Sequence, residues 1–295
     1  MTYPNLSAPQ MLQGYSIEVM PRTAAKIPDF KTLFPVGTRV YIAHIDGTPI
    51  DDMVTTAKRL AHDGFDVMPH FPARSIANLA MLQDWIARYQ GEAGVKQALV
   101  LAGGNARPVG QFTSSIDILQ TGAFEKAGFT HLHVAGHPEG NRDIAADGSH
   151  SVLDEALRWK AEYATETGVE MAIVTQFLFD AKAATEWIAR LRQQEIALPV
   201  HLGVAGPAKL QTLLKFAIAC GVGPSLAVLK KRARDLSKLL LPFEPDDLIE
   251  ALAQEAQTRP EAAPAQIHLF PLGGIQTCAD WASRQGAGHL RRVVG

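Results

Sequence analysis

Short apolar runs alternate with longer stretches of mixed polarity along most of the chain. The short runs are rich in Val, Ile, Leu and aromatic residues and are bounded by Gly, Pro, Asn or Asp, which is the pattern of β-strands. This pattern predicts eight strands, at residues 15–20, 40–44, 66–70, 98–102, 131–135, 171–175, 200–204 and 266–272.

The longer stretches carry apolar residues at helical spacing. They predict helices at residues 49–63, 78–89, 151–165, 181–193 and 207–220. Strands that alternate with helices indicate βαβ units and a parallel sheet. Eight such units in 295 residues favour an α/β fold of the closed (β/α)8 TIM-barrel type. An open doubly wound sheet is the alternative.

The interval between the seventh and eighth strands is too long for a minimal barrel. It contains residues 230–238, with five basic side chains, and residues 246–256, which have helical spacing. We expect extra helices here, after the seventh helix, and a flexible connector at 259–265. The basic run is interpreted as a solvated helix face. No repeat divides the chain, so we expect one domain over residues 1–295.

Composition excludes several classes of protein. Hydrophobic residues make up 47% and charged residues 20%, and the net charge is −2, so neither nucleic acid nor an anionic membrane is an expected partner. Cys220 and Cys278 are too few for a disulfide framework or a metal knuckle, which favours a reducing compartment. Without a secretory pattern at residues 1–13 or a membrane-length apolar run, we expect a cytoplasmic protein. A monomer and a homo-oligomer are both compatible with this composition.

Polar side chains gather where the predicted strands end. In a TIM barrel the active groups lie at the C-terminal ends of the strands. The residues at or near these ends are Glu18, His44, His70, Asn105, His137, Gln176, Gly203 and Leu272. We therefore expect the functional site at this end of the barrel.

Glu18 and Gln176 carry the sharpest chemical hypotheses. Glu18 lies inside a strand between Ile17 and Val19, so burial is expected to raise the pKa of its carboxyl and make it a general acid near neutrality. A buried, paired structural glutamate is the alternative. Gln176 offers both a donor and an acceptor, which suits the edge of a heteroaromatic ligand. Its alternative role is to cap the following helix.

The sequence segments around Glu18 and Gln176 carry a second signal. Residues 16–21 read Ser-Ile-Glu-Val-Met-Pro, and residues 175–180 read Thr-Gln-Phe-Leu-Phe-Asp. They resemble the first and sixth strands of the methylenetetrahydrofolate reductase family, and weaker matches extend the resemblance from Tyr15 to Trp281. The resemblance implies a flavoprotein that holds FAD noncovalently. It would use NADH or NADPH to interconvert 5,10-methylenetetrahydrofolate and 5-methyltetrahydrofolate.

The resemblance also implies roles for individual residues. Glu18 would be the catalytic proton donor that opens the bridged folate ring. The implied substrate contacts are Gln176, Leu210 and Leu272. The implied flavin contacts are His44, His70, Ala102, Gly103, Gly104, Asn105, His137, Asn141, Arg158 and Lys160.

The chain departs from the family pattern at three places. Asn105 stands where the family has an aspartate near the flavin and folate, so a negative charge is lost. His137 takes the place of a tyrosine. Gly274 replaces the arginine that binds the glutamate tail of folate. Recognition of the substrate tail must therefore differ from that of the family.

Two other functions compete with this interpretation. Histidines on or beside several strands, including the pair His131-x-His133, are compatible with a metal-dependent TIM-barrel hydrolase. The altered residues at 105 and 274 are compatible with a barrel that binds folate or flavin without turnover. No Gly-x-Gly-x-x-Gly turn follows the first strand, so a Rossmann-type cofactor site is not expected.

Overall fold

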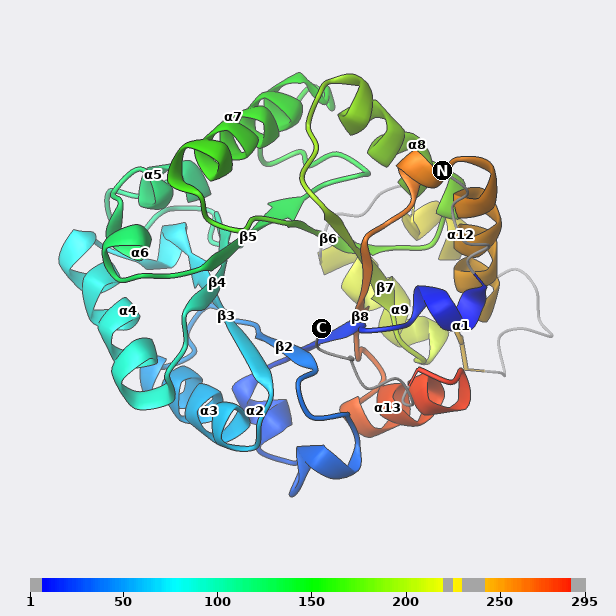
Figure 1. The fold of residues 1–295 in the computed structure, drawn as a ribbon, viewed down its shortest axis with the longest axis horizontal. Coiled ribbons are helices and arrows are strands. Elements are labelled where there is room, and N and C mark those ends of the chain that lie inside the picture. Colours follow the sequence, from blue (N-terminus) through cyan, green and yellow to red (C-terminus); the bar gives the residue numbers. More distant parts are fainter. Residues whose placement is uncertain (1–6, 220–224, 230–241, 288–295) are drawn as a thin grey trace.

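The computed structural model describes residues 7–219, 225–229 and 242–287. Eight parallel strands close into a barrel in chain order, as Figure 1 shows. They are β1 (Ser16–Val19), β2 (Arg39–Ile42), β3 (Asp66–Pro72), β4 (Gln97–Leu101), β5 (His131–Gly136), β6 (Ile173–Leu178), β7 (Val200–Ala205) and β8 (Gln266–Phe270). The predicted (β/α)8 barrel is confirmed, and the open sheet is wrong.

A ring of helices surrounds the strands. The long helices are α3 (Ile50–His62), α4 (Leu79–Ala93), α7 (Ser151–Thr167), α8 (Ala181–Gln193), α12 (Asp246–Thr258) and α13 (Ile275–Arg284). The remaining ones are α1 (Ala8–Met11), α2 (Pro21–Ala24), α5 (Ser115–Leu119), α6 (Ala123–Lys126), α9 (Leu210–Ala219) and the 3₁₀ turns η1 (Phe30–Thr32), η2 (Ala73–Ser75) and η3 (Pro260–Ala262). The apolar spacing predicted most long helices, but the short α5 and α6 were not predicted.

Local capping explains where the long helices begin and end. The Asn78 side chain accepts a hydrogen bond from the Met81 amide at the start of α4, and Gly94 ends this helix with φ of 66°. Asp180 caps α8 in the same way through the Ala183 amide, 3.1 Å away. These side-chain caps fix the first turn of α4 and of α8.

The roles of the helices between β7 and β8 differ from the prediction. We expected residues 207–220 to be the seventh helix of the ring and 246–256 to be extra. Instead α12 packs against α8 and α1 and occupies the ring position, whereas α9 lies behind β7 and β8 in Figure 1. The apolar face of α9 packs on a cluster at the strand ends. The basic run at 230–238 lies outside the described residues.

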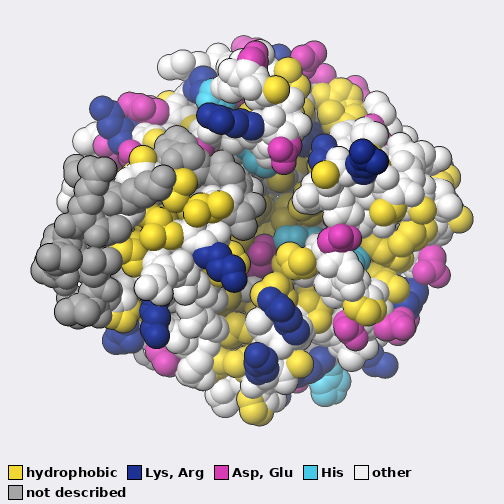
Figure 2. All heavy atoms as spheres, turned by 180° about the vertical axis from the view of Figure 1, so that it is seen from behind, with side chains coloured by type: hydrophobic (Ala, Val, Ile, Leu, Met, Phe, Trp, Pro, Cys, Tyr) yellow, Lys and Arg dark blue, Asp and Glu magenta, His cyan; other side chains and the backbone are white. Residues whose placement is uncertain are grey.

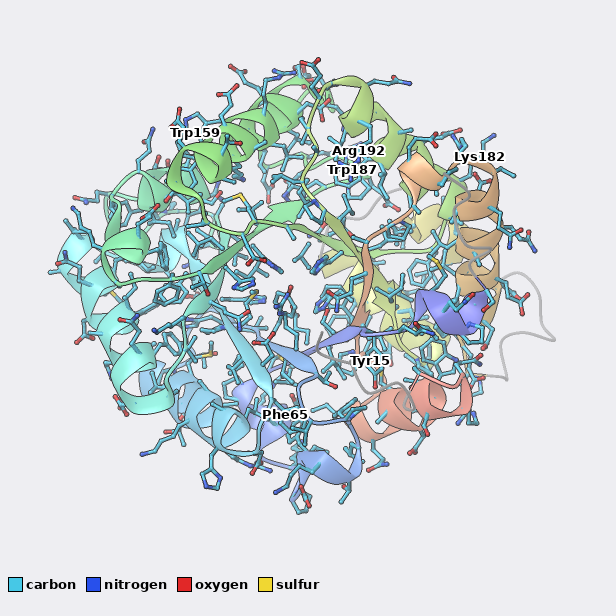
Figure 3. The ribbon with its side chains drawn as sticks, viewed as in Figure 1. Tyr15, Phe65, Trp159, Lys182, Trp187 and Arg192 are labelled. Atoms are coloured by element: carbon cyan, nitrogen blue, oxygen red, sulfur yellow. The ribbon has the colours of Figure 1, made fainter. Side chains whose placement is uncertain are left out.

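Alternation along the strands divides the core into two layers. On β2, Val40 and Ile42 face the helices, whereas Tyr41 faces the inside of the barrel. The outer layer is apolar, and the side chains that fill it include Trp187 of α8, labelled in Figure 3. The inside of the barrel is unusually polar for this fold, which branched aliphatic residues normally fill. The buried polar side chains on its inward positions are Ser16, His70, His133, His201 and His268.

No helix in the described part of the chain combines the length and the apolar character needed to cross a bilayer.

Candidate functional site

An acid and two imidazoles meet inside the mouth of the barrel. Ile17 and Val19 face the helices, so Glu18 between them points inward. Nε2 of His70 lies 3.3 Å from Oε2 of Glu18, and Nε2 of His268 lies 3.7 Å from the same oxygen. Figure 2, which looks at the face opposite to Figure 1, shows acidic and histidine side chains within the hollow at its centre. The mouth therefore holds a carboxylate with two imidazoles on one of its oxygens.

The charge state of Glu18 differs from the expectation. Burial raises the pKa of its carboxyl, but the charge of His70 and the contacts with both imidazoles outweigh burial and lower that pKa to about 2. The predicted raised pKa is therefore wrong. The physical reason is that His70 on β3 and His268 on β8 become neighbours of Glu18 only when the barrel closes.

A second polar group lies deeper in the barrel. The hydroxyl of Tyr41 is 2.6 Å from Nδ1 of His133 and 3.4 Å from Nδ1 of His201. The Tyr41 ring also meets the edge of the His268 ring, with centroids 4.6 Å apart. Burial lowers the pKa of His133 well below 6.5 and the pKa of His201 to about 3. These imidazoles are therefore neutral at pH 7.

The role of this second group was not recognised from the sequence. The signal was present, because Tyr41, His133 and His201 each occupy the inward parity of their strand between apolar neighbours. Partners on three different strands could not be assigned from that signal alone.

A β-bulge directs Gln176 toward the mouth. The pairing of β6 with β7 shifts between Val174 and Phe177, which leaves one extra residue on β6. The Thr175 hydroxyl accepts a hydrogen bond from the Gly203 amide at 2.8 Å. A Cβ atom at Gly203 would lie 2.5 Å from the carbonyl oxygens of residues 175 and 176, so only glycine allows this approach. Thr175 and Gly203 thus explain the unusual ending of this strand.

Gln176 meets His137 across the ends of β5 and β6. The two side chains are hydrogen-bonded to one another, and burial together with the charge of Lys160 lowers the pKa of His137 to about 4. Lys160 projects from the inner face of α7, is 6% exposed, and burial lowers the pKa of its amine to about 8. The structure therefore brings these three predicted residues together.

The turn after β4 forms another wall of the mouth. Gly103 has φ of 93°, and a Cβ atom there would lie 2.9 Å from Pro72 of β3, so glycine is needed. The Asn105 side-chain amide lies 3.3 Å from both Asp46 and Ser75. Gly104 is exposed and Ala102 partly buried. The turn is thus held by its neighbours, with the Asn105 side chain directed to the adjoining loops.

Two predicted flavin contacts lie away from this group. The His44 ring stacks on Trp85 of α4 at 4.8 Å, and its Nε2 donates to the Thr48 carbonyl. Arg158 is exposed on α7 and its guanidinium contacts Gln194. Arg158 also lines a surface cavity with residues that precede β6 and β7, at the end of the barrel opposite the mouth. The structure therefore does not bring Arg158 and Lys160 into one anion site.

The remaining predicted residues lie in a loop and in the apolar cluster. The Asn141 side chain accepts a hydrogen bond from the Asp143 amide, 2.9 Å away, within the loop after β5. Leu210 and Leu272 belong to the apolar cluster at the strand ends, near Phe177. They offer an apolar side to the same mouth.

The residues of the proposed metal pair are engaged separately. His131 lies 3.2 Å from Glu170 and contacts Thr130, whereas His133 contacts Tyr41. Within residues 7–219, 225–229 and 242–287, no group of three or more His, Cys, Asp or Glu side chains is arranged to hold a metal ion.

Comparison with known proteins supports the architecture. No protein-family model matches the chain. An uncharacterized protein from Clostridium thermocellum that binds two copies of 5-methyl-5,6,7,8-tetrahydrofolic acid superposes with a TM-score of 0.59 at 10% identity, over 93% of this chain and 96% of that chain. The 7,8-dihydropteroate synthase of Vibrio fischeri ES114 gives a TM-score of 0.45 at 12% identity, over 94% and 93% of the two chains. The first likeness establishes a shared barrel fold.

Proposed function

We propose that this protein is a flavin-dependent oxidoreductase that interconverts 5,10-methylenetetrahydrofolate and 5-methyltetrahydrofolate. The observation that carries the proposal is the pairing of an ionised Glu18 with His70 on one side of the mouth, opposite the hydrogen-bonded Gln176 and His137. The barrel of Clostridium thermocellum that binds 5-methyltetrahydrofolic acid adds support, because its fold is the same over most of both chains.

The two sides of the mouth suit different parts of a folate. The pterin ring presents adjacent donors and acceptors, which the Gln176 carboxamide can match because it has both. Its flat faces suit the apolar cluster that contains Phe177, Leu210 and Leu272. Glu18 at the mouth can exchange a proton with the bridging nitrogen of a folate bound there. Each of these groups thus has a role in binding or in proton transfer.

The residues at the mouth also fit a flavin. Nδ1 of His137 is buried and has no hydrogen-bond partner among the described residues, so it can meet a ligand atom. Lys160 is a buried cation, and no ion pair of its amine is found among the residues that the structure describes, which suits a phosphate or another anion. The Gly103–Gly104 turn lets backbone approach a flat ring. We propose FAD as the resident cofactor and NADH or NADPH as the hydride donor.

When bound, the flavin supplies the hydride chemistry, and the protein supplies placement, the proton and the electrostatics. Gln176 orients the pterin, and the apolar cluster excludes water from it. The Glu18 carboxylate stabilises positive charge that develops on the folate as its bridge opens. These tasks need only the groups already at the mouth.

The test is to purify the protein and record its visible absorbance, then add FAD to any flavin-free fraction. We expect a flavin spectrum, NADH or NADPH oxidation, and reoxidation of the reduced enzyme by 5,10-methylenetetrahydrofolate. A folded protein that neither carries nor takes up flavin would exclude the proposal. Flavin binding without turnover of either substrate would instead indicate a non-catalytic binding barrel.

A further inference from the structure

Two imidazoles approach a single oxygen of the Glu18 carboxylate. Both Nε2 atoms approach the same carboxylate oxygen, Oε2, and neither has another hydrogen-bond partner among the described residues. The Glu18 side chain is 20% exposed, so part of its carboxylate faces the open mouth. The carboxylate therefore links the buried imidazoles to the space where a ligand would bind.

Glu18 itself does not store the proton. Its neighbours lower the pKa of its carboxyl to about 2 against the effect of burial, so it is ionised throughout the neutral range. A reaction that consumes a proton at this site needs another group to hold that proton until substrate arrives.

The two imidazoles are not equivalent. His268 is fully buried, its Nδ1 lies 2.9 Å from the Ser16 hydroxyl, and burial lowers its pKa. The His70 side chain is 10% exposed and lies closer to the carboxylate, at 3.3 Å against 3.7 Å. His70 thus lies nearer to the carboxylate and has the access to solvent that reloading with a proton requires.

The groups that surround His70 distinguish it further from His268. Glu18 is the carboxylate that faces it, from β1. The other titratable groups around it are Tyr41 on β2, His44 in the loop after β2, and His268 on β8. The pKa of His44 is lowered chiefly by burial, and burial raises the pKa of Tyr41, so both stay neutral near pH 7. Glu18 is therefore the acidic partner of His70 in this cluster.

We propose that His70 is the proton store of the site and that Glu18 relays its proton to the folate. This inference rests on the proposed function. The proton passes from Nε2 of His70 to Oε2 of Glu18, and from the Glu18 carboxyl to N10 of 5,10-methylenetetrahydrofolate. The electron pair of the breaking C–N10 bond goes to N10, and the N5 lone pair forms the C=N5 iminium. One positive charge moves from His70 to the substrate, and Glu18 is again a carboxylate beside it.

The first test needs no flavin and no turnover. Long-range ¹H–¹⁵N spectra of histidine-labelled protein report whether a ring is imidazolium, and His70→Asn identifies the signals of His70. We expect imidazolium at His70 to persist to a higher pH in wild type than in Glu18→Gln, by about one pH unit or more. The exposed His62 provides the control variant, His62→Gln, which should leave these signals unchanged. Loss of the proton at the same pH with and without the Glu18 carboxylate would overturn the proposal.

The second test is stopped-flow reoxidation of the reduced enzyme by 5,10-methylenetetrahydrofolate across pH. The wild-type rate should fall above the pH at which the spectra show His70 losing its proton. His70→Asn should lower this rate by about 10²-fold or more and abolish that fall. A pH profile of the same shape in His70→Asn would overturn the proton store. If the protein lacks flavin or folate turnover, the proposed function fails, and the spectra still decide whether His70 is the protonated partner of Glu18.

Discussion

The neutral histidines inside the barrel predict that this protein loses stability well above the pH at which carboxylates titrate. His133 is 3% exposed and His201 is 7% exposed, and both contact the Tyr41 hydroxyl. Burial lowers the pKa of His133 well below 6.5 and that of His201 to about 3. Acidification from pH 7 to pH 5 is therefore the informative perturbation.

The direction of the change in stability follows from how many protons the folded and the unfolded states bind. Below pH 6.5 the unfolded chain protonates both imidazoles, whereas the folded barrel keeps them neutral, so the unfolded state binds more protons. The free energy of unfolding then falls by about 1.4 kcal/mol per pH unit for each group, or about 2.7 kcal/mol for the pair. Between pH 7 and 5 the loss is about 4 kcal/mol, a large part of the about 5–15 kcal/mol of a typical protein.

The assay is urea unfolding followed by tryptophan fluorescence at a series of pH values, since the chain has four tryptophans. In His201→Gln the slope of stability against pH should fall by about 1.4 kcal/mol per pH unit, because one of the titrating imidazoles is gone. His62→Gln is the matched control, since the His62 side chain is 89% exposed. Its slope should equal that of the wild type.

Two results would refute this reasoning. A wild-type free energy of unfolding that stays constant from pH 7 to pH 5 would show that the folded barrel accepts the protons. An unchanged slope in His201→Gln would show that other groups cause the acid sensitivity.

Three further substitutions test particular contacts. Gly136→Ala should lower the free energy of unfolding by about 1–3 kcal/mol, because its Cβ would lie 2.3 Å from Ile173; an unchanged urea midpoint would contradict this. Gly103→Ala should also destabilise, by about 1 kcal/mol or more, because φ there is 93°, and a neutral result would show that the turn can rearrange. Gln176→Ala should raise the KM for folate while flavin content stays constant, and unchanged folate kinetics would exclude a substrate contact.

The pattern along the chain was enough to predict the barrel and the end at which its polar groups gather. Period-two alternation places Glu18 inward between Ile17 and Val19, and this is a local property of one strand. The unusual segment around Gln176 also proved to be structurally distinct, because it forms the β-bulge against Gly203. FAD, the nicotinamide and the folate stay predictions, since no observation of this structure tests them.

The order of helices between β7 and β8 needed the tertiary structure. Both α9 and α12 have apolar residues at helical spacing, so either is a suitable ring helix by pattern alone. The choice depends on which apolar face fits the gap beside α8, and α12 fills that gap with Leu248, Ile249 and Leu252. The face of α9 instead covers the apolar cluster at the strand ends.

The sequence by itself determined the strands, the helices and the inward position of Glu18, because periodicity depends on residues that are neighbours along the chain. Only the closed barrel decided the charge of that acid. Glu18 meets His70 and His268 through β3 and β8, and their contacts reverse the effect of burial on the pKa of its carboxyl. Electrostatic interactions depend on distance in space, so a group's protonation is settled by strands that lie far away along the chain.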